Sequence, residues 1–494
     1  MSVEMRVNGA GPRMQTPVRR DGMNGRSGAG STPSDRVRWL SFQHGPEDAM
    51  LERLQAVAAQ PYVDHVLALP DLHQKAAMEV PSSLAIATRD VLVPEFTSVA
   101  VNDGMGVIRT DLRERDMTAA RIEDLFARVN RHSAAHPLQR NRYSLDHETL
   151  CGVLEQGARG ALGRYGHEEE ILARFECGGA ARFGEWTAVR GEVIPWLVDT
   201  PMVRNEIGLN FGGNHFLEVQ VVDRVASSAT ASAWGLEAGQ VVIMYHLGPG
   251  PFSGTLLHHY SRRSKLQSSR VPVFMLSKLL FHFLQRDGWR DPAGTWRRHF
   301  RRNGWTPWAS RSPEGRLLRA ALAMAINYGH AYRLATIAAV RDALAETFGA
   351  AVGPRLLCDV PHNGIHLESD GEHETWVARH NACRLQPGAP TIVAGSSDVP
   401  SYLGIGGEGD GGRWHSYDHG IGELLASGRL PAGAGTGRGS ARYRMRRGPD
   451  GGLESRTETP ARSPEPIERL MELFEDADVM RPVVRLRPLG TLKN

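Results

Sequence analysis

Four segments of this sequence place a histidine within two residues of glycine or asparagine, at the end of a stretch that predicts a β-strand. They are Gly212-Gly213-Asn214-His215, Tyr245-His246-Leu247-Gly248, Asp359-Val360-Pro361-His362-Asn363-Gly364 and Asp418-His419-Gly420-Ile421-Gly422. Imidazoles at strand ends project from rigid supports into a common space, and adjacent glycines let a ligand approach the backbone. A single histidine is more often a hydrogen-bonded core residue. Four in this setting indicate a metal site, which with a carboxylate would suit manganese, zinc, iron or nickel.

The carboxylate of such a site could come from Asp103. This residue lies in Asn102-Asp103-Gly104-Met105-Gly106, at a predicted turn between two strands. From spacing alone the simpler interpretation is structural, because Asp-Gly is a common turn-forming pair.

Two glycine-containing loops are candidates for binding phosphate. Gly395-Ser396-Ser397-Asp398 follows a predicted strand and offers hydroxyls and free backbone amides, and Gly420 and Gly422 form a short Gly-x-Gly. Neither matches a P-loop or the full dinucleotide-binding fingerprint, which argues against a standard NTPase or an NAD enzyme.

The remaining pattern predicts an α+β or irregular α/β fold, with central β-sheets flanked by helices. Strands are expected at Tyr62–Leu69, Val91–Val93, Ser98–Val101, Gly106–Arg109, Phe216–Val222, Gln240–Tyr245, Thr391–Ala394 and Val483–Leu489. Helices are expected at 46–60, at 315–348 (one helix, or two joined at Gly329) and at Glu465–Phe474. Because strands and helices follow no regular βαβ rhythm, a Rossmann sheet is not expected.

The low hydrophobic content, 41% of 494 residues, indicates that part of the chain is unstructured. Residues 1–38 read as a disordered basic tail, 39–494 as one domain, and 431–464 as a flexible basic insertion within it. No apolar run approaches the ~18 residues that cross a bilayer. The four cysteines form no CxxC pair, so neither a disulfide framework nor a zinc ribbon is expected, and a cytoplasmic protein is predicted. A net charge of +3 is too small to indicate nucleic-acid binding by itself.

Several longer stretches resemble the RtcB family of RNA ligases, which seal RNA ends using GTP and manganese. They are LPDLHQKA at 69–76, FGGNHFLEVQ at 211–220, NYGHAYR at 327–333, DVPHNGIHLE at 359–368, DHGIG at 418–422 and RLRPLGTLK at 485–493. The resemblance runs from about residue 60 to the end in unchanged order. The Gly-Gly-Asn-His-Phe-Leu-Glu string and the C-terminal string are its most specific parts.

The resemblance implies a role for each matching residue. His419 takes the place of the nucleophile that becomes guanylylated, and His215, His246 and His362 match metal ligands, with Asp103 as a carboxylate beside them. The residues implied in nucleotide binding are Asn214, His215, Phe216, Leu217, Glu218, His362, Asn363, Ala394, Gly395, Ser396, Ser397, Ser401, His419, Gly420, Ile421, Gly422 and Lys493.

The same resemblance implies a reaction and its partners. GMP would pass from His419 to an RNA 3′-phosphate, or to a 2′,3′-cyclic phosphate opened beforehand, and a 5′-hydroxyl would then displace it. One or two Mn²⁺ ions are expected, with zinc, cobalt or nickel as alternatives. RNA and GTP are the expected partners, in RNA repair or tRNA splicing, with no membrane and with a protein helper left open.

The sequence also departs from the family pattern. Ala100 and Asp103 stand where the family usually has an aspartate and a metal-bridging cysteine, and Glu423 replaces an arginine after the nucleophile. Arg379 is kept, but His380 and Asn381 replace a basic pair. These changes leave two alternatives open: a catalytically impaired paralogue that binds RNA or nucleotide, and a metal-dependent phosphoesterase acting on RNA ends.

The segment from Trp289 to Trp308 interleaves tryptophans with arginines. They are Trp289, Trp296, Trp305, Trp308, Arg297, Arg298, Arg301 and Arg302. Arginines for phosphates and aromatic rings for unpaired bases would suit single-stranded RNA. A surface helix that buries its tryptophans in the core is an equally good interpretation.

Overall fold

The computed structural model describes residues 33–40, 48–75, 78–133, 140–181, 183, 193–196, 200–205, 207–208, 211, 213–262, 271–300, 304–369, 373–409, 415–430, 435, 437–445 and 452–493. The strands are β1 (Val37–Trp39), β2 (Val63–His73), β3 (Ser82–Thr88), β4 (Val91–Leu92), β5 (Gly104–Arg113), β6 (Phe216–Val225), β7 (Gln240–Leu247), β8 (Trp308–Ala309), β9 (Arg355–Pro361), β10 (Asn363–Ser369), β11 (Glu374–His380), β12 (Ala382–Arg384), β13 (Pro390–Val393), β14 (Ser401–Gly406), β15 (Ser416–Asp418), β16 (Ser440–Met445), β17 (Leu453–Thr459) and β18 (Met480–Lys493). The α-helices are α1 (Asp48–Ala58), α2 (Ala119–Ser133), α3 (His147–Gln156), α4 (Leu162–Tyr165), α6 (Pro201–Asn205), α7 (Ser228–Ala233), α8 (Gly250–Tyr260), α9 (Val271–Leu280), α10 (Pro292–His299), α11 (Pro313–Phe348), α12 (Gly422–Ala426) and α13 (Glu465–Asp476).

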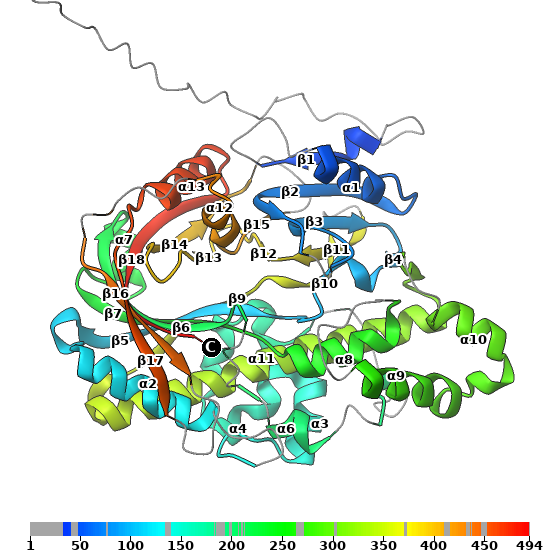
Figure 1. Ribbon diagram of the computed structural model, residues 1–494, viewed down its shortest axis with the longest axis horizontal. Coiled ribbons are helices and arrows are strands. Elements are labelled where there is room, and N and C mark those ends of the chain that lie inside the picture. Colours follow the sequence, from blue (N-terminus) through cyan, green and yellow to red (C-terminus); the bar gives the residue numbers. More distant parts are fainter. Residues whose placement is uncertain are drawn as a thin grey trace, which may run out of the picture.

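Two larger sheets form the centre of the molecule (Figure 1). One has the order β13-β14-β18-β6-β7-β5-β9, with β16 paired to β18 and β17 to β16, and the other has the order β1-β2-β3-β11-β10. Among the described pairings only β1–β2 and β16–β18 are parallel. This confirms the predicted α+β fold without a Rossmann sheet.

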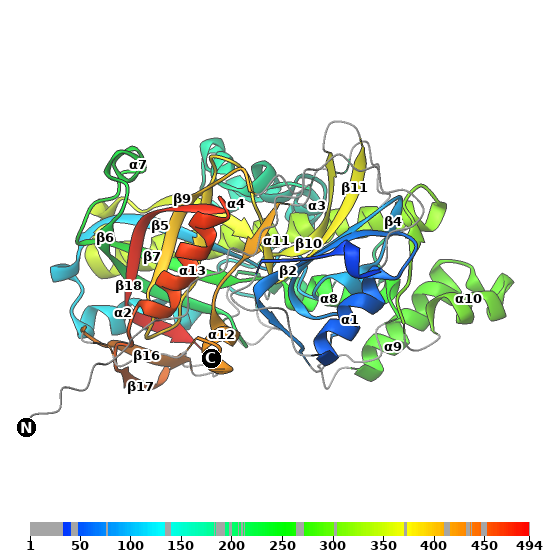
Figure 2. The ribbon, with the colours of Figure 1, turned by 90° about the horizontal axis from the view of Figure 1, so that it is seen from above.

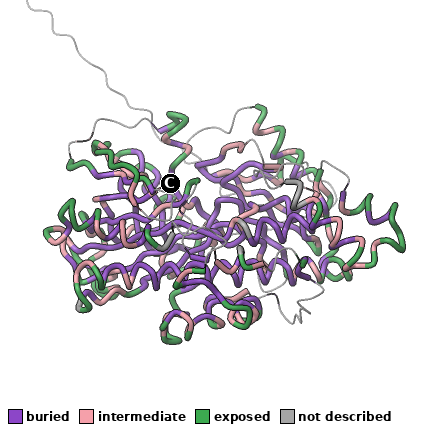
Figure 3. The backbone as a smooth tube through the Cα atoms, turned by 60° about the horizontal axis from the view of Figure 1, so that its bottom comes forward, coloured by how far each residue is buried: buried purple, intermediate pink, exposed green. Residues whose placement is uncertain are grey.

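The central strand β7 shows why these residues form a sheet covered on both faces. All of its side chains are buried. Val241, Ile243 and Tyr245 belong to the core under α2, α3 and α11, whereas Val242 and Met244 belong to the core under α13. Side chains alternate between the two faces of a strand, so a continuous apolar run requires a layer on each face. Figure 3 shows these buried segments through the middle of the molecule.

Helix α11 shows whether the segment around Gly329 forms one helix or two. It is one continuous helix from Pro313 to Phe348, and the side chain of Ser312 accepts a hydrogen bond from the Gly315 amide at its start. Gly329 is a point of close packing, since a Cβ there would lie 2.6 Å from the Cβ of Asn102. The glycine therefore brings the helix against the Asn102-Asp103 turn.

Three predictions made from the sequence differ from the structure. Ser98–Val101 is a turn, because the Ser98 hydroxyl accepts a hydrogen bond from the Ala100 amide and the Asp103 amide donates to the Ala100 carbonyl. The segment at 431–464, predicted to be flexible, contains the hairpin β16–β17, which low-complexity composition hid and which β18 supports through pairing.

The third difference concerns the start of the ordered chain, which precedes Trp39. Strand β1 begins at Val37 and pairs in parallel with β2. Residues 1–32 of the predicted tail lie outside the described residues.

The remaining predictions hold with shifted boundaries. Helix α1, strands β2, β5, β6, β7, β13 and β18 and helix α13 lie where the sequence places them. Figure 2 shows α9 and α10 at the opposite end of the molecule from α13 and β18. Within the described residues, no helix has the length and apolar character that crossing a membrane requires.

Candidate metal and nucleotide site

Neighbouring strands bring the predicted metal ligands to one edge of the large sheet. Asp103 lies in the turn before β5, His246 lies near the end of β7, and His362 links β9 to β10. Gly104 pairs with both Leu247 and Pro361, which aligns these three positions across the sheet. His215 precedes β6, and Phe216 pairs with His246. His419 follows β15, which pairs with β12.

Asp103 is the common neighbour of three imidazoles. Its carboxylate oxygens lie 3.2 Å from His215 Nε2, 3.6 Å from His362 Nε2 and 3.8 Å from His246 Nε2. The Nε2 atoms of His246 and His362 are 3.2 Å apart, an approach that needs a shared proton or a cation between them.

His419 completes the group. The ligand atoms of His246, His362 and His419 lie within 4.8 Å of one another, and no other group of this kind occurs among the described residues. The rings of His362 and His419 are stacked, with centroids 4.5 Å apart. The sequence prediction that the four histidines share one space is consistent with this geometry.

The protonation states of these groups suit a cation. Burial lowers the pKa of His246 to about 4, and it also lowers the pKa of His362 and, well below its usual range, that of His419. Burial alone would raise the pKa of Asp103, but His215, His362 and His246 together hold it well below its ordinary value. Neutral imidazoles around an ionised carboxylate are the donor set that a divalent transition metal takes.

One oxygen of Asp103 also fits a metal. Asp103 is buried, and its Oδ1 has no hydrogen-bond partner among the described residues. A buried carboxylate oxygen without a partner is costly unless a cation or a ligand satisfies it. The residues present therefore fit a metal ion.

His419 has a defined orientation. Its Nδ1 lies 3.2 Å from the carbonyl oxygen of Asn381, which only accepts hydrogen bonds. In the neutral ring Nδ1 therefore carries the proton, and Nε2 keeps its lone pair. Asn381 adopts a left-handed backbone with φ of 53°, and its amide donates to Asn363 Oδ1 at 2.8 Å. Asn381, noted in the sequence only as a departure, thus orients the candidate nucleophile.

A buried polar frame holds the turn that carries Asp103. Arg333 on α11 is fully buried and donates two hydrogen bonds to Asp359, at 2.7 and 2.8 Å. Arg333 also donates to the carbonyl of Asn102, and Tyr245 donates to Asp359 at 2.7 Å. Burial alone would raise the pKa of Asp359, but Arg333 and His330 lower it to about 2.

The sequence by itself indicates no role for the members of this frame, although Arg333 lies in the motif NYGHAYR and Asp359 at the start of DVPHNGIHLE. An arginine inside an otherwise apolar helix was the available signal, because arginine is almost never fully buried unless it is paired.

Several of the residues expected to bind nucleotide form a second connected group. Glu218 accepts hydrogen bonds from Gln220 at 2.6 Å and from Thr491 at 2.5 Å. Gln220 donates to the Ser401 hydroxyl, which also accepts from the Gly395 amide. Burial raises the pKa of Glu218 to about 7, and the hydrogen bonds from Thr491 and Gln220 and the charge of Lys493 partly offset this rise.

The loop 394–397 is joined to the turn of His419 by its backbone. The Ala394 amide donates to the His419 carbonyl at 2.9 Å, and Ile421 donates back to Ala394. Ser440, from the segment predicted to be flexible, donates to the carbonyl of Ser397.

The remaining residues expected to bind nucleotide differ in whether their side chains can reach a ligand. Asn214 Nδ2 lies 3.5 Å from His246 Nε2, and the ring of Phe216 meets His246 edge-on. The side chains of Leu217 and Ile421 are buried in the two cores, so only their backbones could face a ligand. A Cβ at Gly422 would meet nothing within 4 Å.

Lys75, from the LPDLHQKA string, is a functional candidate that the sequence pattern does not indicate. Burial lowers its pKa, while the charges of Asp103, Asp71 and Glu423 raise it, and Lys75 in turn helps to lower the pKa of His419. Lys75 therefore places a positive charge near Asp103 and near Glu423, the residue that stands where the family pattern has an arginine.

The Asp71 side chain in the same string anchors the nucleophile turn. Its Oδ1 accepts from the Leu424 amide and its own amide donates to Asp418, both at 2.7 Å.

The chain is similar to known proteins over most of its length. A family model described as tRNA-splicing ligase RtcB matches residues 53–494. The tRNA-splicing ligase RtcB of Thermococcus kodakarensis is 26% identical, over 90% of this chain and 91% of its own. The RNA-splicing ligase RtcB of Mycobacterium tuberculosis is 26% identical over 86% and 96%, and the tRNA-splicing ligase RtcB of Aeropyrum pernix is 23% identical over 78% of each chain. This chain therefore belongs to the RtcB family of RNA-splicing ligases.

Proposed function

We propose that this protein is a GTP- and manganese-dependent RNA ligase that joins RNA 3′-phosphate or 2′,3′-cyclic phosphate ends to 5′-hydroxyl ends through guanylylated His419. The observation that carries this proposal is the half-buried, neutral His419, whose Nδ1 faces a carbonyl and whose ring stacks on His362. Such an imidazole presents an unprotonated Nε2 to an electrophile.

Asp103, His215, His246 and His362 are the residues that would hold the metal. A bound divalent ion neutralises phosphate oxygens and orients a displacement at phosphorus. Manganese is favoured because the Asp103 carboxylate is a hard oxygen ligand, and zinc, cobalt or nickel remain compatible with the imidazoles.

The chemistry proceeds by three displacements at phosphorus. His419 Nε2 attacks the α-phosphorus of GTP, forming an N–P bond and releasing pyrophosphate. An oxygen of the RNA 3′-phosphate then attacks the same phosphorus, breaking that bond and taking the GMP. The 5′-hydroxyl of the second RNA finally attacks the activated 3′-phosphate, loses its proton and releases GMP. Throughout, Nδ1–H donates to the Asn381 carbonyl, which stabilises the positive imidazole of the covalent state.

The nucleotide is proposed to lie between the metal ligands and the group around Glu218. In that position the Glu218 carboxylate would accept hydrogen bonds from guanine, with Thr491 and Gln220 fixing its orientation. The loop 394–397, Asn214, Asn363, the 420–422 turn and Lys493 would supply the remaining polar contacts. We assign the reaction to the cytoplasm, because the four cysteines are all free thiols.

The test is the intact mass of the purified protein after incubation with GTP and Mn²⁺. We expect a gain of one GMP that requires His419, and no gain with ATP, with chelator or in His419→Ala. His73→Ala removes a histidine from the LPDLHQKA string outside the metal cluster and should still form the adduct. Absence of any adduct across several metals would contradict the proposal.

Two alternatives have specific observations in their favour. Ala100 lacks a side chain that could bind metal, and Glu423 brings a negative charge near Asp71 and Lys75. These features would suit a relative that binds RNA or nucleotide without forming an adduct. Release of phosphate from a 3′-phosphate end without joining would instead identify a phosphoesterase.

A further inference from the structure

The helices at one end of the molecule expose large apolar side chains. We define the helical lobe as α9, the π-helical turn at Phe281–Gln285, the turn at Gly288–Arg290, and α10. It lies at the side of the molecule, away from α13 (Figure 1). Leu276, Leu284, Trp289 and Trp296, all on this lobe, are each more than half exposed. The fifth exposed large hydrophobic residue of the described chain, Trp196, follows Ile194, whose carbonyl accepts a hydrogen bond from Gln285.

This gathering is unusual for a protein surface. Exposed apolar side chains are normally scattered singly, and a concentration of them marks a binding surface. The exposure of the tryptophans also distinguishes the two interpretations of the 289–308 segment, a surface for single-stranded RNA and a surface helix that buries its tryptophans. Trp305 and Trp308 pack against the main core, whereas Trp289 and Trp296 stay more than half exposed, with Trp296 stacked on Phe300 at a centroid distance of 5.0 Å. Arg301 and Arg302 lie outside the described residues.

The charges around these rings are mostly positive. Between residues 284 and 300 the lobe carries four arginines, Arg286, Arg290, Arg297 and Arg298, against two acids, Asp287 and Asp291. Both acids also serve the fold: Asp291 caps α10 by accepting from the Gly294 amide at 3.0 Å, and Asp287 accepts from the Trp289 indole at 3.3 Å. The Arg290 guanidinium lies over the Trp289 ring, 5.4 Å from its centroid. Arginine stacked beside an exposed indole suits a ligand with both phosphates and planar bases.

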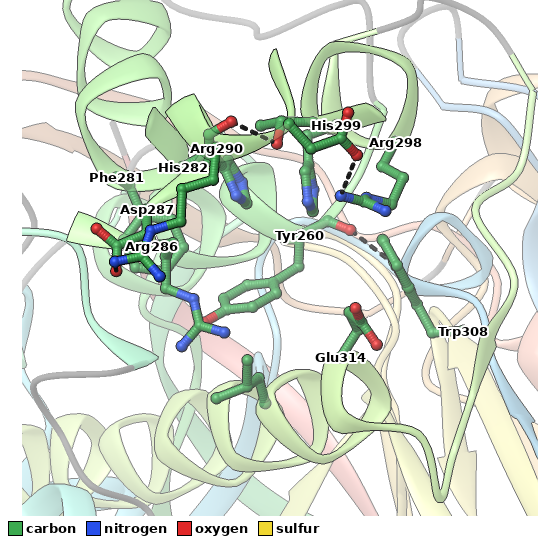
Figure 4. Close-up of a pocket in the computed structure, with 14 residues that line it drawn as sticks. Tyr260, Phe281, His282, Arg286, Asp287, Arg290, Arg298, His299, Trp308 and Glu314 are labelled. Carbon is green, nitrogen blue, oxygen red and sulfur yellow. Dashed lines mark hydrogen bonds and ion pairs between the residues drawn. The ribbon is translucent and has the colours of Figure 1, made fainter. Parts of the chain in front are cut away.

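A small cavity opens between the lobe and helices α8 and α11 (Figure 4). Its volume is about 190 Å³, below the roughly 300–1,000 Å³ of sites for whole drug-sized ligands. His282 and His299 stack with centroids 3.6 Å apart, and His299 stacks in turn on Trp308 at 5.6 Å. Arg286, Arg290 and Arg298 also line the cavity, together with the acids Asp287, Asp291 and Glu314. Arg290 lies 3.8 Å from Asp287 and Arg298 lies 3.5 Å from Asp291.

The ring stack is uncharged. Burial lowers the pKa of His299 to about 3 and lowers that of His282 further. The neutral rings and the guanidinium groups line one cavity, a combination that suits a planar base and its phosphate.

We propose that the helical lobe binds a single-stranded segment of the RNA substrate, with one unpaired base in the cavity and neighbouring bases on Trp289 and Trp296. The identity of the ligand as substrate RNA rests on the proposed function, but the binding itself needs no catalysis. A paired duplex would not fit, because its bases are stacked inside the helix and cannot reach exposed indoles.

The test measures RNA affinity directly. The probe is a fluorescent single-stranded RNA of 12 nucleotides with hydroxyls at both ends, titrated with the full-length protein without GTP and followed by anisotropy. We expect Trp289→Ala/Trp296→Ala to weaken binding roughly fivefold or more, as loss of base stacking does. Trp289→Phe/Trp296→Phe should restore most of the affinity.

Salt dependence tests the arginines. Arg290→Ala/Arg297→Ala should lower the slope of log affinity against log salt by about 1.4, since each phosphate contact on a single strand contributes about 0.7. The matched control is Arg469→Ala/Arg481→Ala, which removes two exposed arginines near α13 at the other end of the molecule and should bind like wild type.

Affinity of the folded Trp289→Ala/Trp296→Ala protein within twofold of wild type overturns the proposal, and would assign the surface to a protein partner instead. Failure of the proposed function is a separate result. A protein without a GMP adduct can still show this RNA binding, and lobe variants without RNA binding should still form the adduct on His419.

Discussion

The side of the site that carries Asp103 is held by a fully buried ion pair, whereas the side around Glu218 is held by hydrogen bonds between side chains of three strands. Arg333 and Asp359 join α11, β9 and the Asn102 turn without access to solvent. Glu218, Gln220, Ser401 and Thr491 instead link β6, β14 and β18.

This difference teaches how the two sides can change. A buried ion pair is costly to form and more costly to break, because loss of one partner leaves an uncompensated charge. Hydrogen bonds in the Glu218 group can be lost one at a time at modest cost. The Asp103 side should therefore fail as a unit, and the Glu218 side by degrees.

The largest expected effect comes from Arg333→Ala. It leaves Asp359 buried without its cation, and we expect the free energy of unfolding to fall by about 3–5 kcal/mol. Urea denaturation measures this loss. The control is Arg159→Ala, which breaks the exposed pair with Glu169 and should cost at most about 1 kcal/mol. Equal losses in the free energy of unfolding of the two variants would contradict the expectation that the buried Arg333–Asp359 pair stabilises the fold more than an exposed ion pair does.

The second effect is a pH dependence of stability that depends on Glu218. The pKa of Glu218 is raised from 4.5 to about 7 in the folded protein, so the folded state holds its proton more tightly than the unfolded chain. The free energy of unfolding should therefore fall as the pH rises from about 4.5 to about 7, by at most about 3 kcal/mol. Urea denaturation across this range, compared with Glu218→Gln, isolates the effect. A Glu218→Gln profile parallel to wild type would contradict the assignment.

A third, smaller effect tests the contact between α11 and the Asp103 turn. Gly329→Ala would place a Cβ 2.6 Å from that of Asn102, and such overpacking costs about 1–3 kcal/mol. Gly163→Ala, in α4, meets nothing within 4 Å and should be neutral or slightly stabilising. We also expect Gly329→Ala to weaken Mn²⁺ binding, measured by calorimetry, whereas Gly163→Ala should not. Unchanged Mn²⁺ affinity in a destabilised Gly329→Ala protein would separate the packing from the metal site.

The two sides also differ in how much of them the sequence predicts. The histidines were predicted because each stands within two residues of glycine or asparagine at a strand end, a local pattern. Arg333, Asp359 and Asn102 were missed because their role depends on a helix and a turn that lie more than 200 residues apart in the chain. Asn381 was missed for a similar reason, since it acts through its backbone carbonyl and not through its side chain.

The secondary structure was likewise predicted where its signal is local and missed where it depends on long-range pairing. Strands β6 and β7 and helix α13 were predicted from their apolar periodicity, which is local. The hairpin β16–β17 was not, because its composition is polar and glycine-rich and it is supported by parallel pairing with β18. Tertiary pairing of this kind leaves little signal in the segment itself.

The smallest expected effect tests whether that hairpin takes part in the site. Ser440 at the start of β16 is buried and donates to the carbonyl of Ser397 in the loop beside His419. Ser440→Ala removes one hydrogen bond, so we expect a loss of about 1 kcal/mol in stability and a several-fold weaker GTP affinity, with Mn²⁺ affinity unchanged. Ser455→Ala, at an exposed position of β17, is the control and should change neither. If Ser440→Ala weakened metal and nucleotide binding equally, the Asp103 side and the Glu218 side would be coupled through the His419 turn. The two sides would then differ in the interactions that hold them together, but not in how they respond to this mutation.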